Sequence, residues 1–349
     1  MSGALAASAP RLCALPALAA LDLSRNRFTG AVPAALTACS VVATLLLREN
    51  LLTGAVPPEL LSSRQLRKVD LSYNTLAGEI SGSGSPVLEY LDLSVNMLSG
   101  TIPPELTALP SLSYLDLSGN NLSGPVPEFP ARCRLVYLSL YTNQLSGAIP
   151  RSLANCGNLT TLYLSYNGIG GKVPDFFASM PNLQVLYLDD NKFVGELPQS
   201  IGKLMSLEQL VVSNNGFTGT VLDAIGKRQS LTMLYLDRNN FTGSIPVFVS
   251  TFSRLQKFSM AHNSISGRIP PEIGKCQELV ELQLQNNSLS GTIPLELCKL
   301  SQLQNFYLHS NSLSGELPAE ITQMRKLREI SLFGNNFTGV SRRSAGRID

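Results

Sequence analysis

Tryptophan is missing from this 349-residue chain, and histidine occurs only at His262 and His309. No serine, cysteine or carboxylate pair surrounds these histidines in a nucleophile or metal-binding pattern, and no glycine-rich phosphate loop leads from a strand into a helix. We therefore predict that the chain is not an enzyme, has no catalytic or metal site, and needs no cofactor.

An excess of one charge and long apolar runs are also absent. The formal net charge is +2, with both signs scattered along the chain, whereas a nucleic-acid surface usually shows a basic stripe. No apolar run reaches the roughly 18 residues of a membrane span. We expect no nucleic-acid partner and no membrane span in this chain. A signal peptide at the alanine-rich start is disfavoured, because no basic segment precedes it and Arg11 interrupts the apolar run.

What the chain does contain is one unit repeated many times. The pattern LxLxxNxFxGxLP of residues 186–198 returns about every 24 residues, and its asparagine can be followed through the whole chain. Of the thirteen intervals between these asparagines eleven are 24, one is 22 and one is 23. A fixed period of this size is the signature of a solenoid, and LxxLxLxxNxL is the leucine-rich repeat pattern. The asparagines that define the predicted asparagine ladder are Asn26, Asn50, Asn74, Asn96, Asn120, Asn143, Asn167, Asn191, Asn215, Asn239, Asn263, Asn287, Asn311 and Asn335.

The chemistry of one coil explains its pattern. Alternating aliphatic residues such as Leu186 and Leu188 predict a strand with one buried face. The asparagine that follows can both donate and accept hydrogen bonds where the chain turns inside the solenoid. Gly195 permits backbone angles that a Cβ would forbid, and Pro198 starts the return path. We predict an α/β leucine-rich repeat solenoid with a parallel concave sheet and a 3₁₀ or short-helical convex side.

The array is predicted to span residues 1–340 in about 14 repeats, followed by a polar tail at 341–349. The repeat near residues 75–96 has 22 residues and a Ser/Gly tract, which predicts either a shortened surface loop or a weak joint. The chain starts inside a repeat, with Gly3 and Leu5 in register, and neither end carries a cap sequence. We expect a fragment that frays from its ends.

Six cysteines occur, at Cys13, Cys39, Cys133, Cys156, Cys276 and Cys298. They stand at convex positions that face the interior, and no CxxC pair is present. We expect buried free thiols that behave as small apolar side chains, rather than disulfides or a zinc site.

The 24-residue repeat with recurring SGxIP and TGxIP resembles the plant-specific leucine-rich repeats, in particular the ectodomains of plant receptor-like kinases that sense secreted peptides. The resemblance covers residues 1–340. It implies a right-handed superhelix with a second short sheet near GxIP, and a glycosylated location on the extracellular face of the plasma membrane. It also implies a secreted peptide or protein ligand and a shorter leucine-rich repeat co-receptor kinase. A membrane span and a serine/threonine kinase domain, which the family carries, are not recognisable in this sequence.

Tyrosine has a distribution that the repeat pattern alone does not explain. All ten tyrosines fall six, four, two or one residue before a ladder asparagine, which are the exposed positions of the predicted concave face. A line of rigid amphipathic side chains is typical of a protein or peptide contact surface. We predict an extended binding surface there, while Asp22, Asp70, Asp92 and Asp116 belong to a recurrent LDLS turn and are expected to be structural. The predicted ligand-binding residues are Tyr163, Tyr187, Asp189, Asp190, Tyr235, Asp237, Arg238, Lys257 and His262.

Two functional classes remain open from the sequence. One is a receptor ectodomain, or a fragment of one, that binds an extracellular peptide. The other is a stand-alone leucine-rich repeat protein that inhibits a secreted wall-degrading enzyme. Five glycosylation sequons are compatible with either, at Asn121, Asn158, Asn240, Asn286 and Asn336.

Overall fold

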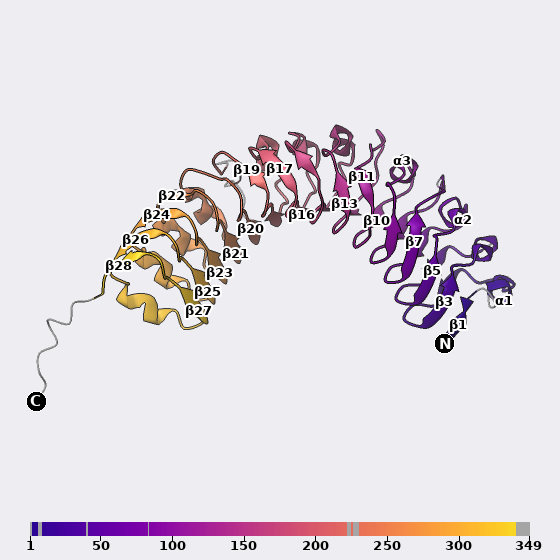
Figure 1. Ribbon diagram of the computed structural model, residues 1–349, viewed down its shortest axis with the longest axis horizontal. Helices are drawn as coiled ribbons and strands as arrows, with labels where there is room; N and C mark the ends of the chain where they lie inside the picture. The colour runs from indigo at the N-terminus through magenta and orange to yellow at the C-terminus, as the bar shows by residue number, and fades with distance from the viewer. Residues whose placement is uncertain are drawn as a thin grey trace, which may run out of the picture. The chain divides into compact units, whose positions relative to one another are not determined.

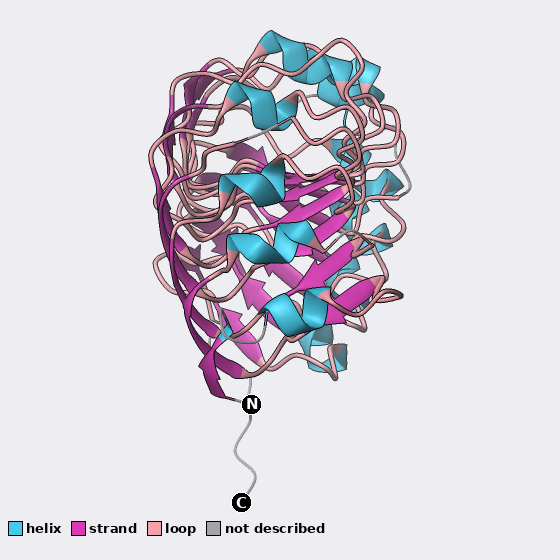
Figure 2. Cartoon of the chain, turned by 90° about the vertical axis from the view of Figure 1, so that its right-hand side faces the viewer, coloured by secondary structure: helices cyan, strands magenta, loops and turns pink. Residues whose placement is uncertain are grey.

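A computed structural model of the chain describes residues 2–5, 9–39, 41–82, 84–221, 225 and 230–339. The chain forms two compact units, Met1–Phe193 and Val194–Asp349, which are described separately. Figures 1 and 2 show that short strands and loops make up most of each unit, with brief helical segments beside them. The predicted solenoid of strands, 3₁₀ turns and short helices is confirmed.

The first unit contains a long parallel sheet with one strand from each repeat. Neighbouring strands pair without a shift in the repeat register, so that Leu115 lies between Leu91 and Leu138. These central residues are buried, while the first residues of the strands, such as Tyr90 and Tyr114, are only half-buried and form a column of side chains on the concave face. In order, the strands are β2 (Ala20–Asp22), β4 (Thr44–Leu46), β6 (Lys68–Asp70), β8 (Tyr90–Asp92), β10 (Tyr114–Asp116), β12 (Tyr137–Ser139), β14 (Thr161–Tyr163) and β16 (Val185–Tyr187).

Shorter parallel strands follow the ladder asparagine in most repeats of the first unit. Gly3 pairs with Phe28 as Gly30 pairs with Leu52, so residues 2–5 hold the predicted register. These strands are β1 (Ser2–Ala4), β3 (Arg27–Ala31), β5 (Leu51–Gly54), β7 (Thr75–Glu79), β9 (Met97–Ser99), β11 (Ser123–Pro125), β13 (Gln144–Ser146), β15 (Gly170–Gly171) and β17 (Lys192–Gly195), the last of which contains the boundary between the units.

Helical segments carry the chain back along the other side of the first unit. Several start directly after the repeat proline, because its fixed φ suits the first turn and its missing N–H needs no partner there. In Figure 1, α2 and α3 lie on the side opposite the long sheet. The segments are α1 (Ala9–Cys13), η2 (Ala34–Ala38), α2 (Pro58–Leu61), α3 (Pro104–Thr107), η3 (Arg151–Asn155) and η4 (Phe177–Ser179).

The second unit repeats the same plan with larger core side chains. Phe217, Phe241, Phe252, Phe258 and Phe306 are fully buried. Its long-sheet strands are β18 (Gln209–Val211), β20 (Met233–Tyr235), β21 (Lys257–Ser259), β23 (Glu281–Gln283), β25 (Asn305–Tyr307) and β27 (Glu329–Ser331). Its shorter strands and 3₁₀ segments are β19 (Gly216–Phe217), β22 (Ser266–Arg268), β24 (Ser288–Gly291), β26 (Ser312–Gly315), β28 (Asn336–Phe337), η5 (Gln199–Lys203), η7 (Val247–Thr251), η8 (Pro271–Lys275), η9 (Leu295–Lys299) and η10 (Ala319–Gln323).

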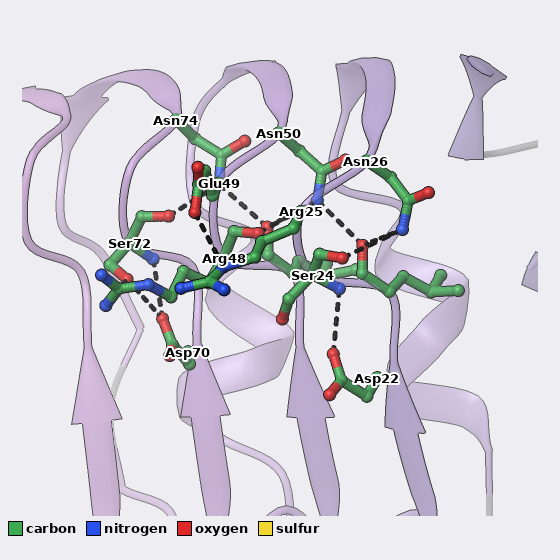
Figure 3. A network of polar contacts seen from close by, with 12 residues as sticks. Asp22, Ser24, Arg25, Asn26, Arg48, Glu49, Asn50, Asp70, Ser72 and Asn74 are labelled. Carbon is green, nitrogen blue, oxygen red and sulfur yellow. Dashed lines mark hydrogen bonds and ion pairs between the residues drawn. The ribbon is translucent and has the colours of Figure 1, made fainter. Parts of the chain in front are cut away.

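The ladder asparagines join neighbouring coils through buried backbone groups. Figure 3 shows Asn26, Asn50 and Asn74 side by side above the long sheet. The Asn74 amide donates to the carbonyl oxygens of Leu47 and Leu71 at 3.0 Å each, and its Oδ1 accepts from the Leu52 N–H at 3.0 Å. Each such side chain therefore satisfies polar groups in its own coil and in the preceding one, which explains why a residue with both donor and acceptor recurs there.

The residue before each ladder asparagine adopts a left-handed backbone conformation. Its φ lies between 51° and 57° in twelve repeats, and glycine occupies the equivalent place at Gly119 and Gly334. Tyr73, Tyr166, Asp190, Arg238 and His262 all stand in this column. The turn displays these side chains at the edge of the concave face at a cost in backbone energy.

The prediction that all six cysteines are free is wrong for four of them. Cys13 forms a disulfide with Cys39, and Cys133 forms one with Cys156, in each case between adjacent coils. The repeat stacks equivalent positions so closely that the Cα atoms are 4.5 Å and 4.7 Å apart, within the range that a disulfide spans. Cys276 and Cys298 are buried free thiols, as predicted, and burial raises the pKa of Cys276 to about 11.

The 22-residue repeat is a packed short loop over its described residues, which favours the first of the two interpretations. Ser85 is fully buried, and its hydroxyl donates to the Ser63 carbonyl at 2.6 Å. A Cβ on Gly82 would lie 2.5 Å from Pro58, so only glycine fits there. Ser83 of the Ser/Gly tract and the predicted polar tail lie outside the described residues. Across the described residues, no helix is long and apolar enough to cross a membrane.

Candidate functional site

Five tyrosines form a continuous row across the concave face of the first unit. We call Tyr90, Tyr114, Tyr137, Tyr163 and Tyr187 the tyrosine row; they come from the consecutive strands β8 to β16. The Tyr90 and Tyr114 rings stack with centroids 4.1 Å apart, and the Tyr114 and Tyr137 rings at 4.3 Å. The spacing of parallel strands, about 4.8 Å, is what allows identical positions to stack in this way.

Between β12 and β14 the tyrosine row moves from one column of the sheet to another, that is, from the first strand position to the last. Tyr137 is the first residue of its strand, whereas Tyr163 and Tyr187 are the last residues of theirs. The Tyr137 and Tyr163 rings therefore meet edge to face, with centroids 6.0 Å apart and an interplanar angle of 69°. Tyr163 and Tyr187 also meet edge to face, at 4.9 Å and 78°. In an edge-to-face pair one ring presents its rim, so its own face is not covered by that contact.

A hollow of about 370 Å³ lies at this change of column. Small hydroxyl side chains at Ser118 and Ser139 leave space between the large rings. A volume of this size falls within the range of small-ligand sites. The hollow is lined by Asp116, Ser118, Tyr137, Ser139, Tyr141, Tyr163 and Tyr187.

Asp116 is the charged residue in the lining of the hollow. Its Oδ1 accepts from the Ser118 N–H at 2.9 Å and from the Ser118 hydroxyl at 2.6 Å. Its Oδ2 accepts from the Tyr137 hydroxyl at 3.3 Å, which is a long bond for two oxygens. The Ser118 bonds fix the carboxylate in position, and Oδ2, with one long bond, keeps capacity to accept another.

The tyrosines of the row remain neutral at physiological pH. Burial is the largest cause that raises the pKa of Tyr114, Tyr137, Tyr163 and Tyr187. The pKa of Tyr90 is raised to about 12 by burial and by the nearby Asp92 carboxylate. The hydroxyl groups therefore stay available as hydrogen-bond donors, and the surface consists of aromatic faces with polar rims.

A column of aspartates runs beside the row. Asp70, Asp92 and Asp116 are each less than a tenth exposed, and each accepts the backbone N–H of the serine two residues later. Burial raises the pKa of Asp92 to about 6. Lys68 places its ammonium 4.3 Å from the Tyr90 ring centroid, so a cation already sits over the first ring of the row.

The predicted site residues of the first unit separate into two groups. Tyr163 and Tyr187 line the hollow. The buried Asp189 instead accepts a short hydrogen bond from the Ser165 hydroxyl of the preceding coil. Asp190 stands in the left-handed column, where its charge is the largest cause that raises the pKa of Tyr166.

The predicted site residues of the second unit form a separate polar cluster. The Tyr235 hydroxyl donates to Glu281 at 3.1 Å, and Asp237 accepts from the Ser213 hydroxyl at 2.6 Å. His262 lies 3.3 Å from the Asn286 amide, and burial followed by the charge of Arg238 lowers the pKa of His262. Lys257 is half-buried on β21. In this unit Asp237 and Tyr235 take part in contacts within the protein itself.

Five residues of the hollow, Tyr141 among them, were missed as site residues by the sequence analysis. Asp116 was assigned to the recurrent turn, and Ser118 and Ser139 have no distinguishing feature in the sequence. Tyr137 was recognised only as one of ten concave tyrosines. The signal that could have identified the hollow is the change of column from Tyr137 to Tyr163, next to the repeat of 23 residues.

Comparison with protein families matches three leucine-rich repeat profiles. They are described as Leucine rich repeat at residues 158–217, Leucine Rich repeats (2 copies) at 86–131, and Leucine Rich Repeat at 134–156, 230–252, 254–276, 278–300 and 302–324. Together the matched segments cover more than half of the chain. The chain belongs to the leucine-rich repeat family. A comparison with curated proteins found no match.

Solved structures narrow the likeness to ectodomains of plant receptor kinases. One is the Arabidopsis receptor kinase HAESA in complex with the peptide hormone IDA and the co-receptor SERK1. It is 33% identical with a TM-score of 0.82, and the match covers 97% of this chain and 60% of the HAESA chain in that structure. PEPR1 in complex with AtPEP1 is 31% identical with a TM-score of 0.83, covering 97% and 51%. A TDR receptor is 28% identical with a TM-score of 0.88, covering 96% and 58%.

This leucine-rich repeat chain spans between half and two thirds of the length of those three structures. A second matched HAESA structure is described as its leucine-rich repeat ectodomain in complex with a peptide hormone ligand. The likeness is therefore to a binding domain and not to a catalytic one. The prediction that the chain is a plant-type leucine-rich repeat receptor ectodomain array is confirmed.

Proposed function

We propose that this chain is the peptide-binding part of a plant receptor ectodomain, and that an extended extracellular peptide binds across the concave face of the first unit. The observation that carries the proposal is the tyrosine row with its hollow. Five rigid aromatic side chains on successive strands offer large contact area at a low cost in side-chain entropy.

The geometry favours an extended ligand over a compact one. The row crosses β8, β10, β12, β14 and β16, so a ligand that uses all of it must run across the strands. The relatives support this interpretation, because HAESA and PEPR1 were solved with the peptides IDA and AtPEP1. The two disulfides fit a protein of the extracellular space, since disulfides persist in oxidising compartments.

A shorter leucine-rich repeat kinase is the partner that we propose for the ligand-bound state. The HAESA complex contains the co-receptor SERK1 together with its peptide. Attachment of sugars at Asn121, Asn158, Asn240 and Asn336 would be sterically feasible, because these side chains are exposed. The co-receptor, the attached sugars and a location on the extracellular face of the plasma membrane are all parts of this proposal.

The proposal is tested by titrating the full chain with a pool of synthetic extended peptides and measuring affinity for wild type, Tyr163→Ala, Tyr187→Ala and Met97→Ala. We expect each tyrosine change to weaken binding by about 2 kcal/mol, the typical value for a buried aromatic anchor. Met97 is 61% exposed on β9, away from the long sheet, and its replacement should leave affinity unchanged. Binding that survives both tyrosine changes but is lost in Met97→Ala would contradict the proposal.

A further inference from the structure

We infer that the hollow between Tyr137, Tyr163 and Asp116 is a specificity pocket for one cationic side chain of the ligand, and that arginine fits it best. This inference rests on the proposed function and adds the chemistry of one ligand residue to it. Two features of the hollow lead to it: its charge and the interruption of the ring stack.

The charge of the hollow selects a cation. Among its lining residues, Asp116 is the charged group, and no lysine or arginine is present to neutralise it. Asp116 is 8% exposed, so an approaching cation would meet its charge in a poorly hydrated setting where the attraction is strong. The Asp116 Oδ2 accepts one long bond, of 3.3 Å from the Tyr137 hydroxyl, and a carboxylate oxygen can accept a further hydrogen bond.

The arrangement of the rings supplies the second attraction. Tyr114 is stacked on both sides, by Tyr90 and by Tyr137, and has no face to offer. The edge-to-face contacts of Tyr163 with Tyr137 and with Tyr187 interrupt the stack, and each such contact covers the face of only one ring of the pair. The same unit shows that such faces hold cations, since the Arg48 guanidinium carbon lies 4.4 Å from the Tyr73 ring centroid and Lys68 stands over Tyr90.

Arginine suits this combination better than lysine. A guanidinium group is planar, so it can lie against a tyrosine face while its N–H groups donate to a carboxylate at its edge. The Tyr137 hydroxyl is displaced from Asp116 Oδ2 at little cost, because its bond is long and the hydroxyl can turn toward the ligand backbone. An apolar ligand side chain would instead leave the Asp116 carboxylate buried without compensation.

The test uses the full chain labelled with ¹³C in its tyrosine rings and two probes of the same shape. Acetyl-Gly-Arg-Gly amide carries the guanidinium, and acetyl-Gly-citrulline-Gly amide replaces it with a neutral urea. Each probe is titrated at millimolar concentrations into wild type, Asp116→Asn and Asp92→Asn. Asp92 is the matched control, because it is buried in the same turn of the preceding repeat and lies outside the hollow.

We expect the arginine probe to shift the ring signals of Tyr137, Tyr163 and Tyr187, with citrulline binding at least ten-fold more weakly. Asp116→Asn should reduce arginine binding to the level of citrulline, and Asp92→Asn should leave it unchanged. Tyr163→Leu keeps apolar bulk without a π face and should also weaken binding of the arginine probe. The inference can therefore be tested even where Asp116→Asn does not fold. Equal binding of the two probes, or equal effects of Asp116→Asn and Asp92→Asn, would overturn it.

The peptide pool separates failure of this inference from failure of the proposed function. Pool members that bind the tyrosine row without any preference for arginine over citrulline leave the proposed function intact and refute the arginine pocket. If no pool member binds the row while the arginine probe still occupies the hollow, the proposed function fails, and the inference fails with it as a statement about a peptide ligand.

Discussion

At the scale of single residues, the turn after each concave strand is the place where this protein accepts backbone strain. The left-handed conformation there suits glycine and asparagine, and it is least favourable for a β-branched residue. Val95 occupies it with a φ of 52°, although its side chain is 41% exposed and buries little apolar surface. The repeat architecture imposes this turn whichever residue the sequence supplies.

We predict that Val95→Asn raises the free energy of unfolding by about 1 kcal/mol, because asparagine tolerates the left-handed region better than valine. Chemical denaturation of the two proteins measures the difference. The reciprocal change Gly119→Val places a β-branched residue at φ 62°, with a Cβ 3.3 Å from Val95 Cγ2, and should lower stability by more than 1 kcal/mol. A stabilising Gly119→Val would show that the turn is not strained.

The ladder asparagines are predicted to be far more important for stability than the exposed ion pairs beside them. Asn74→Ala leaves the buried Leu52 N–H without its acceptor and removes one of the donors to each of the Leu47 and Leu71 carbonyl oxygens, which keep the amides of Asn50 and Asn96, and should cost about 3 kcal/mol. Glu49→Ala, in the same view of Figure 3, removes only the exposed ion pair with Arg25 at 3.1 Å and should cost less than about 1 kcal/mol. Comparable losses in thermal denaturation of the two variants would contradict this ranking.

Asp92 gives the first unit a predictable dependence on pH. Its folded-state pKa of about 6 lies above its ordinary value of 3.8, so between these pH values the unfolded state binds fewer protons than the folded state. Stability from this group is therefore present at acidic pH and is lost as the pH rises through about 6. Asp92→Asn keeps an acceptor for the Ser94 N–H and should stabilise the protein at pH 7 by about 2 kcal/mol, but have little effect at pH 4. Equal effects at both pH values in denaturant titrations would refute the assignment.

At the scale of elements, stacking in fixed register decides which side chains meet. Cys13 and Cys39 lie eight and six residues before their strand centres, Leu21 and Leu45, and this pair of positions is bridged. Cys298 and Met324 hold the same two positions before Phe306 and Ile330. The sequence analysis placed the cysteines at convex positions that face the interior but did not infer the disulfides, because it considered each position within its own coil and not against the next coil.

We predict that Met324→Cys forms a disulfide with Cys298, because the repeat places the two residues as it places Cys13 and Cys39. Met324 and Cys298 are both buried, so the bond is expected to form during oxidative folding. Mass spectrometry of peptides from the unreduced variant detects the link. The control is Met324→Ser, which retains a free thiol at Cys298. A free thiol at both positions of Met324→Cys would show that the register differs in the last repeats.

Much of the fold could be predicted from the sequence, because the period of 24 fixes strand, turn and return path in every coil. The alternation around Leu186 and the proline at Pro198 gave the right elements at those places. The change of column from Tyr137 to Tyr163 can be read from the sequence, but the shape of the hollow cannot, because it depends on the angle between these two rings and on the small size of Ser139. Such angles arise from the packing of neighbouring strands, and no sequence period records them.

At the scale of the whole molecule, the proposed function depends on one surface and not on the repeat. The tyrosine row lies entirely within the first unit, while the second unit presents an internally bonded polar cluster around Tyr235 and His262. The predicted ligand-binding residues therefore divide between two units whose surfaces differ in chemistry. We assign the proposed anchor positions to the first unit and make no corresponding assignment for the second.

The most direct test of this assignment is hydrogen exchange of the full chain, compared with and without a saturating peptide selected from the synthetic pool. Backbone amides in β10, β12, β14 and β16 should exchange more slowly in the complex, and Tyr163→Ala should abolish that protection at the same peptide concentration. Amides in the convex segments α2 and η3 serve as the internal control and should not change. Protection confined to the convex segments, with the four strands unchanged, would contradict the claim that the tyrosine row binds the ligand.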